Sequence, residues 1–314
     1  MRAAIVTGAD HGYFPLMHAL LTTLGGSSAE PPFPLVVLDF GMEPEEVAAA
    51  KAMAARVVRP DWWFDAPAAL RVPRNLGYAA RPMIPNYFPG YDAYLWLDAD
   101  ISVRDDRFVL DFLRAAFDGT LAIVEEADPS YRAELYALKW RLGNAFRCFG
   151  PRDGLRICLG RQINSGAFAL RADAPHWSAW RRHYRNAVTR AGRANLDQHA
   201  LMATLHLEGL PATYLDSTHN WICARSQPIW DDQRRVFCRP LPPFEPISVL
   251  HLAGRQKHGT REIGLIGGGT RSMPLSYAGL GDVSVQADLG SLALPLPTMA
   301  TESPQPSAVS SAMR

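Results

Sequence analysis

The fold of this chain is indicated by one stretch, Tyr94-Leu95-Trp96-Leu97-Asp98-Ala99-Asp100-Ile101-Ser102-Val103. It begins with apolar residues that are too few for a helix, continues with two carboxylates spaced by one residue, and then becomes apolar again. Short apolar runs with aromatic and β-branched residues are typical of buried strands. Ligands bind at the carboxyl ends of the strands in open α/β sheets, so we expect Asp98 and Asp100 to lie at a ligand site.

Asp98 and Asp100 are expected to point to the same side, because side chains alternate along an extended backbone. Two like charges that face each other repel unless a cation lies between them. A divalent metal that holds a phosphorylated ligand meets this demand, since Mg²⁺ and Mn²⁺ prefer oxygen ligands. The alternative is that one aspartate caps the following turn and the other is solvated.

The composition is that of a globular protein. The 314 residues are enough to bury a large core, and 48% of them are hydrophobic and 20% are charged. The formal net charge of +1 gives no electrostatic reason for nucleic acid as a partner. The four cysteines form no Cys-x-x-Cys pair, which argues against a zinc site and favours reduced, buried thiols.

The sequence shows no targeting or membrane-spanning segment. The apolar run within residues 1–10 is too short for a signal peptide, and no stretch is long enough and free enough of charge to span a bilayer. These features predict a cytoplasmic protein. Contact with the inner face of a membrane stays open as an alternative to a fully soluble state.

Strands and helices alternate along the first hundred residues. Apolar runs predict strands at 2–7, 34–40 and 56–58, and helical spacing predicts helices at 13–24 and 43–55. Continuous apolar strands separated by helices indicate a mostly parallel sheet that is covered on both faces. We therefore expect an α/β fold in which residues 1–103 form a nucleotide-binding half.

The rest of the chain continues this alternation less regularly. The patterns predict strands at 120–124, 163–170, 213–215 and 247–252, helices at 107–117, 130–146, 174–190 and 196–207, a short helix interrupted by prolines at 78–87, and an irregular stretch at 147–161. We expect residues 104–270 to form an acceptor half, so that 1–270 make one domain. Pro, Ala and Ser accumulate afterwards, which predicts a partly disordered tail at 271–314.

Taken together, four segments resemble the family 8 glycosyltransferases. They are 5–13, 78–103, 164–170 with Asp197-Gln198, and His251-Leu252-Ala253-Gly254-Arg255-Gln256-Lys257, so the resemblance spans residues 2–260 in separate motifs. It implies a GT-A fold, in which a Rossmann-like nucleotide half joins an acceptor half. It also implies a metal-dependent enzyme that moves a sugar, with retention, from a nucleotide-diphosphate sugar such as a UDP-sugar to a saccharide, a glycolipid or a protein.

The resemblance implies a metal site made of Asp98, Asp100 and His251, filled by Mn²⁺ or Mg²⁺. In the family the histidine of His-x-x-Gly-x-x-Lys is a metal ligand and the lysine contacts the diphosphate, and His251, Gly254 and Lys257 match this motif. Two carboxylates and an imidazole suit Mn²⁺ chemically as well. The alternatives are a core or capping histidine and a solvated lysine in a basic cluster. The family often has Pro-Trp after the lysine, whereas this chain has His258-Gly259.

The resemblance also implies which residues contact the nucleotide. Thr7, Asp10 and Tyr13 match the turn that holds the base and ribose, and Asp10 has a capping role at the next helix as its alternative. Ala99, between the two aspartates, is expected to face the donor. Arg81 matches an arginine that contacts the donor, with an exposed arginine on a buried stem as its alternative.

Two further motifs are implied to lie at the sugar. Asn164-Ser165-Gly166 resembles the family's Asn-Ala-Gly segment at the donor sugar, and a β-bulge is the plain alternative for the glycine. Asp197 and Gln198 resemble the pair near the anomeric carbon and are the candidate catalytic residues. An amide is a poor nucleophile, so a front-face route assisted by the leaving phosphate is at least as plausible. A helix cap is the alternative for Asp197.

Other candidate residues and other functions remain open from the sequence. Glu125-Glu126 is a second acidic pair, ranked lower because adjacent residues of a strand point to opposite faces. The tryptophans are expected to lie mostly in the core, with some available to stack on a sugar. A nucleotidyltransferase would need a basic, glycine-rich loop after the first strand, and 8–12 contain no basic residue except a histidine. A sugar- or nucleotide-binding protein without turnover is the third hypothesis.

Overall fold

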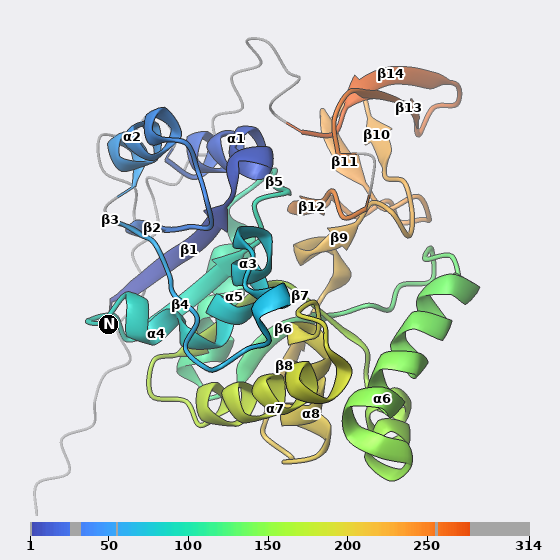
Figure 1. Cartoon of the computed structure of the whole chain (residues 1–314). Helices are drawn as coiled ribbons and strands as arrows, with labels where there is room; N and C mark the ends of the chain where they lie inside the picture. Colours follow the sequence, from blue (N-terminus) through green and yellow to red (C-terminus); the bar gives the residue numbers. More distant parts are fainter. Residues whose placement is uncertain (1, 26–32, 55, 255–256, 277–314) are drawn as a thin grey trace, which may run out of the picture.

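The computed structural model describes residues 2–25, 33–54, 56–254 and 257–276. Its centre is a seven-stranded sheet with the strand order β3-β2-β1-β4-β7-β6-β8 (Figure 1). The strands are β1 (Ala3–Ala9), β2 (Leu35–Asp39), β3 (Arg56–Val58), β4 (Ala93–Leu97), β6 (Leu121–Glu125), β7 (Ile163–Arg171) and β8 (Ala212–Leu215).

The sheet is mostly parallel, as the sequence predicted. Strands β1, β2, β3 and β4 run parallel to one another, and β8 runs parallel to β6. Strand β7 lies between β4 and β6 and is antiparallel to both. In the parallel half the strand order is β3-β2-β1-β4. Strands β2 and β3 therefore lie on one side of β1 and β4 lies on its other side. Open α/β sheets bind ligands at the point where the strand order switches in this way.

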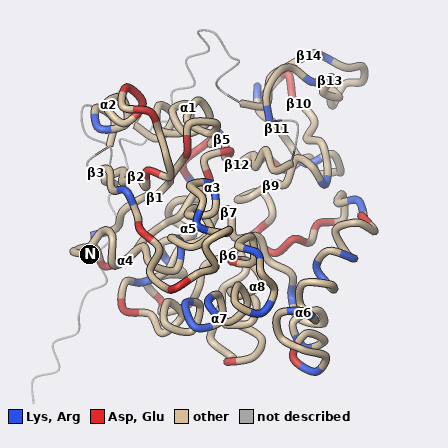
Figure 2. The backbone as a smooth tube through the Cα atoms, in the orientation of Figure 1, with Lys and Arg blue, Asp and Glu red and all other residues tan. Residues whose placement is uncertain are grey.

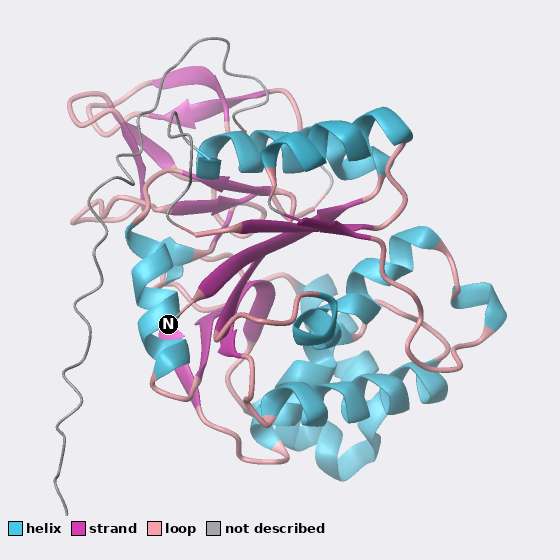
Figure 3. Ribbon diagram, turned by 90° about the vertical axis from the view of Figure 1, so that its left-hand side faces the viewer, coloured by secondary structure: helices cyan, strands magenta, loops and turns pink. Residues whose placement is uncertain are grey.

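Helices cover both faces of the sheet, which Figure 3 shows from the side. The helices are α1 (Phe14–Gly25), α2 (Pro44–Met53), α3 (Pro73–Ala80), α4 (Ile84–Tyr87), α5 (Arg107–Phe117), α6 (Leu135–Leu159), α7 (His176–Ala191) and α8 (Asp197–His206). Short 3-10 turns are found at η1 (His11–Tyr13), η2 (Ala68–Leu70), η3 (Arg81–Met83) and η4 (Ser217–His219).

The continuous apolar strands are explained by the two cores that they separate. Ile5 and Leu95 point into a core with α1 and α5, whereas their neighbours Val6 and Trp96 point into a second core with α7 and α8. Successive side chains of a strand alternate between faces, so a strand covered on both sides must be apolar at every position.

A small second sheet stands beside the central one. Its order is β5-β12-β9, from β5 (Ile101–Val103), β12 (Val249–His251) and β9 (Trp221–Ile222). Two hairpins complete the described chain, β10 (Ile229–Asp231) with β11 (Val236–Cys238), and β13 (Thr260–Gly264) with β14 (Thr270–Pro274). Strand β5 follows β4 after a short turn, so the Asp98–Asp100 segment connects the two sheets.

One predicted element is wrong in its extent. The expected helix at 130–146 and irregular stretch at 147–161 are instead the long helix α6, which is kinked where Gly150 has φ 80° and Pro151 follows. Proline lacks the N–H that a continuous helix needs, and glycine tolerates the positive φ at the bend. Most of the predicted tail, residues 277–314, lies outside the described residues. Its first residues, from 271 on, belong to the strand β14.

Candidate functional site

The two aspartates lie in the turn that carries the chain from β4 into β5. The backbone N–H of Asp98 donates to the carbonyl oxygen of Gly166 on β7 (2.7 Å), and the N–H of Leu252, just after β12, donates to the carbonyl oxygen of Asp100 (2.9 Å). The turn is therefore held from both sheets. It lies at the carboxyl end of β4, the position predicted from the sequence.

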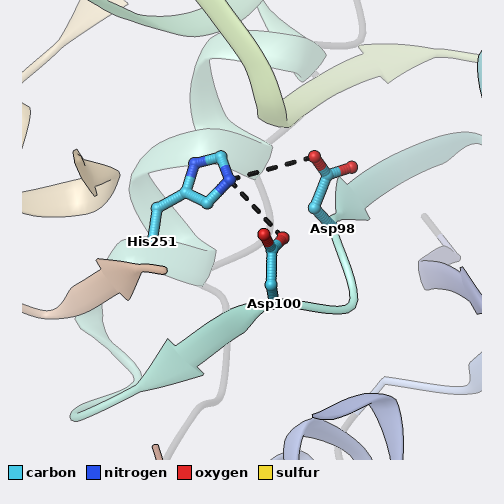
Figure 4. Close-up of side chains that lie close together, drawn as sticks. All are labelled: Asp98, Asp100 and His251. Carbon is cyan, nitrogen blue, oxygen red and sulfur yellow. Dashed lines mark ion pairs between the residues drawn. The ribbon is translucent and has the colours of Figure 1, made fainter. Parts of the chain in front are cut away.

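His251 reaches the aspartates through the pairing of β12 with β5. The register places His251 opposite Ile101, one residue beyond Asp100. Its Nε2 lies 3.5 Å from Asp100 Oδ1 and 4.0 Å from Asp98 Oδ2 (Figure 4). A residue that is about 150 positions away in sequence thus completes the group formed by the two carboxylates.

The other oxygen of each carboxylate is bound by a cation. Arg81 Nη2 and Trp96 Nε1 donate to Asp98 Oδ1, and Lys257 Nζ donates to Asp100 Oδ2. The remaining oxygens, Asp98 Oδ2 and Asp100 Oδ1, are the two that face the imidazole. The carboxylates are therefore held so that one oxygen of each is left for a shared ligand.

The charges of this group are strongly coupled. Burial alone would raise the pKa of Asp100, but His251 and Lys257 hold that pKa well below its ordinary value. Burial raises the pKa of Asp98 above the ordinary value despite its pairing with Arg81. Burial opposes the charged form of His251, but Asp100 and Asp98 together raise the pKa of the imidazole. The buried group therefore favours a positive charge between the two carboxylates.

The donor set fits an octahedral divalent ion. One ligand atom from each of Asp98, Asp100 and His251 lies within 4.8 Å of the others. An ion about 2.1 Å from each ligand would hold neighbouring ligand atoms about 3 Å apart and opposite ones about 4.2 Å apart. The distances from His251 Nε2 to Asp100 Oδ1 (3.5 Å) and to Asp98 Oδ2 (4.0 Å) lie between these two values. Carboxylate and imidazole ligands suit Mn²⁺ or Mg²⁺, and three protein ligands leave positions for phosphate oxygens.

Asn220 sets the tautomer of the histidine. Asn220 Nδ2 donates to Asn164 Oδ1 (3.0 Å), so Asn220 Oδ1 is the atom that lies 3.0 Å from His251 Nδ1. A carbonyl oxygen only accepts hydrogen bonds, so Nδ1 carries a hydrogen and Nε2, the nitrogen that faces the carboxylates, is the one that could bind a metal. Partners of this kind orient a histidine for metal binding. Asn220 was not predicted from the sequence, because nothing in its local pattern connects it with His251.

Gly166 is required by the close approach of His251. A Cβ atom at this position would lie 2.4 Å from Cε1 of His251 and 2.8 Å from Oδ1 of Asn164. The backbone N–H of Gly166 also donates to Asn164 Oδ1 (2.9 Å). The ladder between β6 and β7 has its irregularity next to this segment, which agrees with the bulge alternative. The glycine thus makes room for the imidazole.

We expect Gly166→Ala to weaken Mn²⁺ binding by about tenfold to a hundredfold, because the new methyl group displaces an oriented histidine. Titration calorimetry with Mn²⁺ measures this effect. Gly143→Ala is the matched control, since a Cβ atom there meets no other atom within 4 Å. Equal Mn²⁺ affinity in both variants would show that the site tolerates the methyl group.

Arg81 joins three of the predicted site residues. Its Nη1 donates to Asp197 Oδ2 and to the Ser165 hydroxyl (3.1 Å), and its Nη2 donates to Asp98. Burial opposes the charge on the guanidinium, but Asp98 and Asp197 raise its pKa above the ordinary value. Arg81 is 9% exposed, so the alternative of a surface arginine is wrong.

Asp197 lies in the first turn of α8 and does not cap that helix. The N-cap residue is Leu196, and no side chain bonds to the helix N-terminus there. Asp197 is 4% exposed, and its carboxylate is bound by Arg81 and by the Ser165 hydroxyl (3.1 Å). The capping alternative is therefore wrong, and the carboxylate serves to hold Arg81.

Glu126 connects the residues expected at the sugar. Its Oε1 accepts from Asn164 Nδ2 (3.1 Å) and from Gln198 Nε2 (3.4 Å), and its Oε2 lies 3.1 Å from Arg225 Nη2. The amide oxygen of Gln198 accepts from the backbone N–H of Ser165 (3.2 Å). The alternation of strand side chains gave Glu126 a low rank among the candidates, although its place one residue past the end of β6 is a signal of the same kind as that of Asp98.

The turn after β1 brings Tyr13 to Lys257. Asp10 Oδ1 accepts from the N–H of Tyr13 (3.1 Å) and caps η1, so the capping alternative describes Asp10 in the structure. The ammonium group of Lys257 lies 4.5 Å from the centre of the Tyr13 ring, which is 41% exposed. Thr7 is buried on β1.

The other predicted residues have mixed surroundings. Ala99 is buried in the core, and Gly254 is exposed with φ 102°, a backbone conformation that glycine adopts readily. Glu125 pairs with Arg161 (3.4 Å) at the surface, away from Glu126's partners.

All eight tryptophans are buried or half-buried, in agreement with the core interpretation. Within the described segments, no helix is long and apolar enough to cross a bilayer.

Comparisons with solved structures find similar glycosyltransferases. A crystal structure of the galactosyltransferase LgtC with donor and acceptor sugar analogs matches 80% of this chain and 87% of its own, at 18% identity and a TM-score of 0.51. The bifunctional glycosyltransferase WbbM matches 81% of this chain and 46% of its own, at 16% identity and a TM-score of 0.48. Mouse xyloside xylosyltransferase 1 matches 81% and 98%, at 14% identity and a TM-score of 0.48.

The similarity to LgtC confirms the GT-A fold that the sequence resemblance implied. No protein-family model matches the sequence, and no curated protein matches it at a significant level. At 18% identity this similarity shows the fold alone.

Proposed function

We propose that this protein is a metal-dependent glycosyltransferase that transfers a sugar from a nucleotide-diphosphate sugar, most simply a UDP-sugar, with retention. The observation that carries the proposal is the convergence of Asp98, Asp100 and His251 at the carboxyl end of β4 in a GT-A fold. Each carboxylate presents one oxygen to the histidine while a cation binds the other, which is the arrangement a shared ion requires.

Stabilising the departing diphosphate is the main electrostatic demand of the reaction. A bound divalent ion supplies Lewis-acid stabilisation of the phosphate oxygens. Lys257 lies beside this group; burial opposes its charge, but Asp100 and Tyr13 together raise its pKa above the ordinary value, so the side chain stays cationic. Its Nζ donates to Asp100, and the flexible side chain can turn its charge toward a diphosphate.

The donor sugar is proposed to lie against Asn164, Ser165 and Gly166. Gly254 would bring the backbone before Lys257 close to the diphosphate. Thr7, Asp10, Tyr13 and Ala99 would border the nucleoside, with residues 1–103 as the nucleotide half and 104–270 as the acceptor half. Saccharides, glycolipids and proteins are the acceptor classes to test.

The surroundings of Asp197 and Gln198 favour the front-face route to retention. Asp197 is the carboxylate nearest to Gln198 in sequence. Its side chain is buried, and Arg81 and the Ser165 hydroxyl both bind the same carboxylate oxygen. Asp197 therefore serves as a positioning residue. Gln198 carries an amide, whose oxygen is a weak nucleophile. Glu126 and the Ser165 N–H orient that amide from both ends. A double displacement through either side chain is therefore disfavoured.

The proposal is tested with a panel of nucleotide sugars, by measuring nucleoside diphosphate release with added Mn²⁺ and with excess chelator. We expect release from one class of donor with Mn²⁺ and none with chelator. Full activity in chelator would overturn the metal dependence. Pyrophosphate release from a nucleoside triphosphate would instead identify a nucleotidyltransferase. Mn²⁺-dependent UDP binding without turnover of any donor would identify a binding protein.

A further inference from the structure

Exposed apolar side chains are concentrated on α6. Eight large hydrophobic residues are exposed among the described residues, and six of them belong to this helix. Leu135, Tyr136 and Leu159 are each at least 75% exposed, and Leu138, Leu155 and Phe146 complete the set. Clusters of this kind on a soluble protein mark interaction surfaces.

The inward side of α6 is packed against the rest of the protein, and the exposed apolar residues lie on its outward side. Asn144, Ala145, Cys148, Gly154 and Ile157 are buried against the body of the protein. Past the kink at Gly150 the second part of the helix folds back on the first, where a Cβ at Gly154 would lie 3.0 Å from the backbone of Ala145. The exposed apolar residues are thus presented by a bent helix that is packed in place.

The same helix is strongly basic. It contains Lys139, Arg141, Arg147, Arg152 and Arg156 and one acidic residue, Asp153. Arg141 lies 3.6 Å from Glu126, whereas Lys139, Arg147, Arg152 and Arg156 lie on the exposed side. Figure 2 shows blue segments along the length of α6 with little red beside them. Exposed apolar and cationic side chains therefore occur together along the helix.

We propose that the outer surface of α6 docks on an anionic lipid bilayer. Leucine and aromatic side chains enter the headgroup region, while lysine and arginine keep their charges at the phosphates on long apolar stems. A second copy of this chain is disfavoured, because a two-fold interface would bring the same cations together. A protein groove is disfavoured too, since the cations are interspersed with the apolar residues rather than confined to one edge.

Vesicle sedimentation of the full chain tests the proposal. The probes are vesicles of phosphatidylcholine alone and of phosphatidylcholine with phosphatidylglycerol. We expect binding to the anionic vesicles only, and weaker binding at higher salt. Leu135→Ser with Leu138→Ser should lower the partition coefficient at least about tenfold, and so should Arg147→Gln with Arg152→Gln. Leu241→Ser, at an exposed leucine outside α6, is the matched control.

Several outcomes would overturn the proposal. Wild-type protein that ignores anionic vesicles rules it out, and so does unchanged binding by both α6 variants. Dimerisation that is lost in the leucine variant, without vesicle binding, would assign the surface to a second copy. Because all the substituted residues are exposed, circular dichroism should show folded variants. Vesicle binding needs no donor sugar, so its result is independent of the proposed transferase activity.

Discussion

Replacing Asp100 with asparagine is expected to abolish metal-dependent donor cleavage, with a loss of more than about a hundredfold. The asparagine keeps the shape of the side chain but removes the charge that faces His251 Nε2 at 3.5 Å and pairs with Lys257. The variant loses an ion ligand and the anchor of the lysine together. Titration calorimetry with Mn²⁺ and nucleoside diphosphate release measure the two effects.

Asp173→Asn is the control for Asp100→Asn. The Asp173 side chain is 69% exposed and pairs with Arg171 at the surface, so activity should stay within about twofold of wild type. Circular dichroism has to accompany these measurements, because the change also removes the buried partner of His251 and Lys257. Wild-type Mn²⁺ affinity in the Asp100 variant would contradict the assignment of the metal site.

Arg81→Met is expected to have the largest effect on stability, about 3–5 kcal/mol in the free energy of unfolding. The arginine side chain is 10% exposed, and its loss leaves the carboxylates of Asp98 and Asp197 without their shared cation. An unpaired buried charge costs far more than a lost surface contact. Urea unfolding measures the loss, which we expect to be smaller with saturating Mn²⁺, since the ion supplies positive charge beside Asp98.

Arg171→Met is the matched control, because its ion pair with Asp173 is exposed, and we expect a change within about 1 kcal/mol. Combining Arg81→Met with Asp197→Asn should recover part of the lost stability by removing one unpaired charge. Equal effects of Arg81→Met and Arg171→Met would mean that the buried ion pairs contribute little, contrary to our account of the site.

The sequence by itself determined the α/β class and the place of the aspartates. Val6 and Trp96 alternate with Ile5 and Leu95 toward two separate cores, so β1 and β4 had to be apolar throughout, and such runs are recognisable in any sequence. Asp98 and Asp100 end such a run and therefore had to lie at the sheet edge. His251 and Lys257 entered the prediction through a family resemblance and not through local physics.

Only the tertiary structure decided which side chains meet. The register of β12 on β5 brings His251 to the aspartates, and no local signal specifies a pairing between strands so far apart in the chain. The same holds for Asn220 on the imidazole and for Arg81 between two carboxylates. The extent of α6 was missed because Gly150, with φ 80° and ψ 178°, does interrupt the helical geometry, and only the structure shows that a second helical stretch begins directly after it. Local patterns encode strands and turns, while contacts between distant segments depend on how the whole core packs.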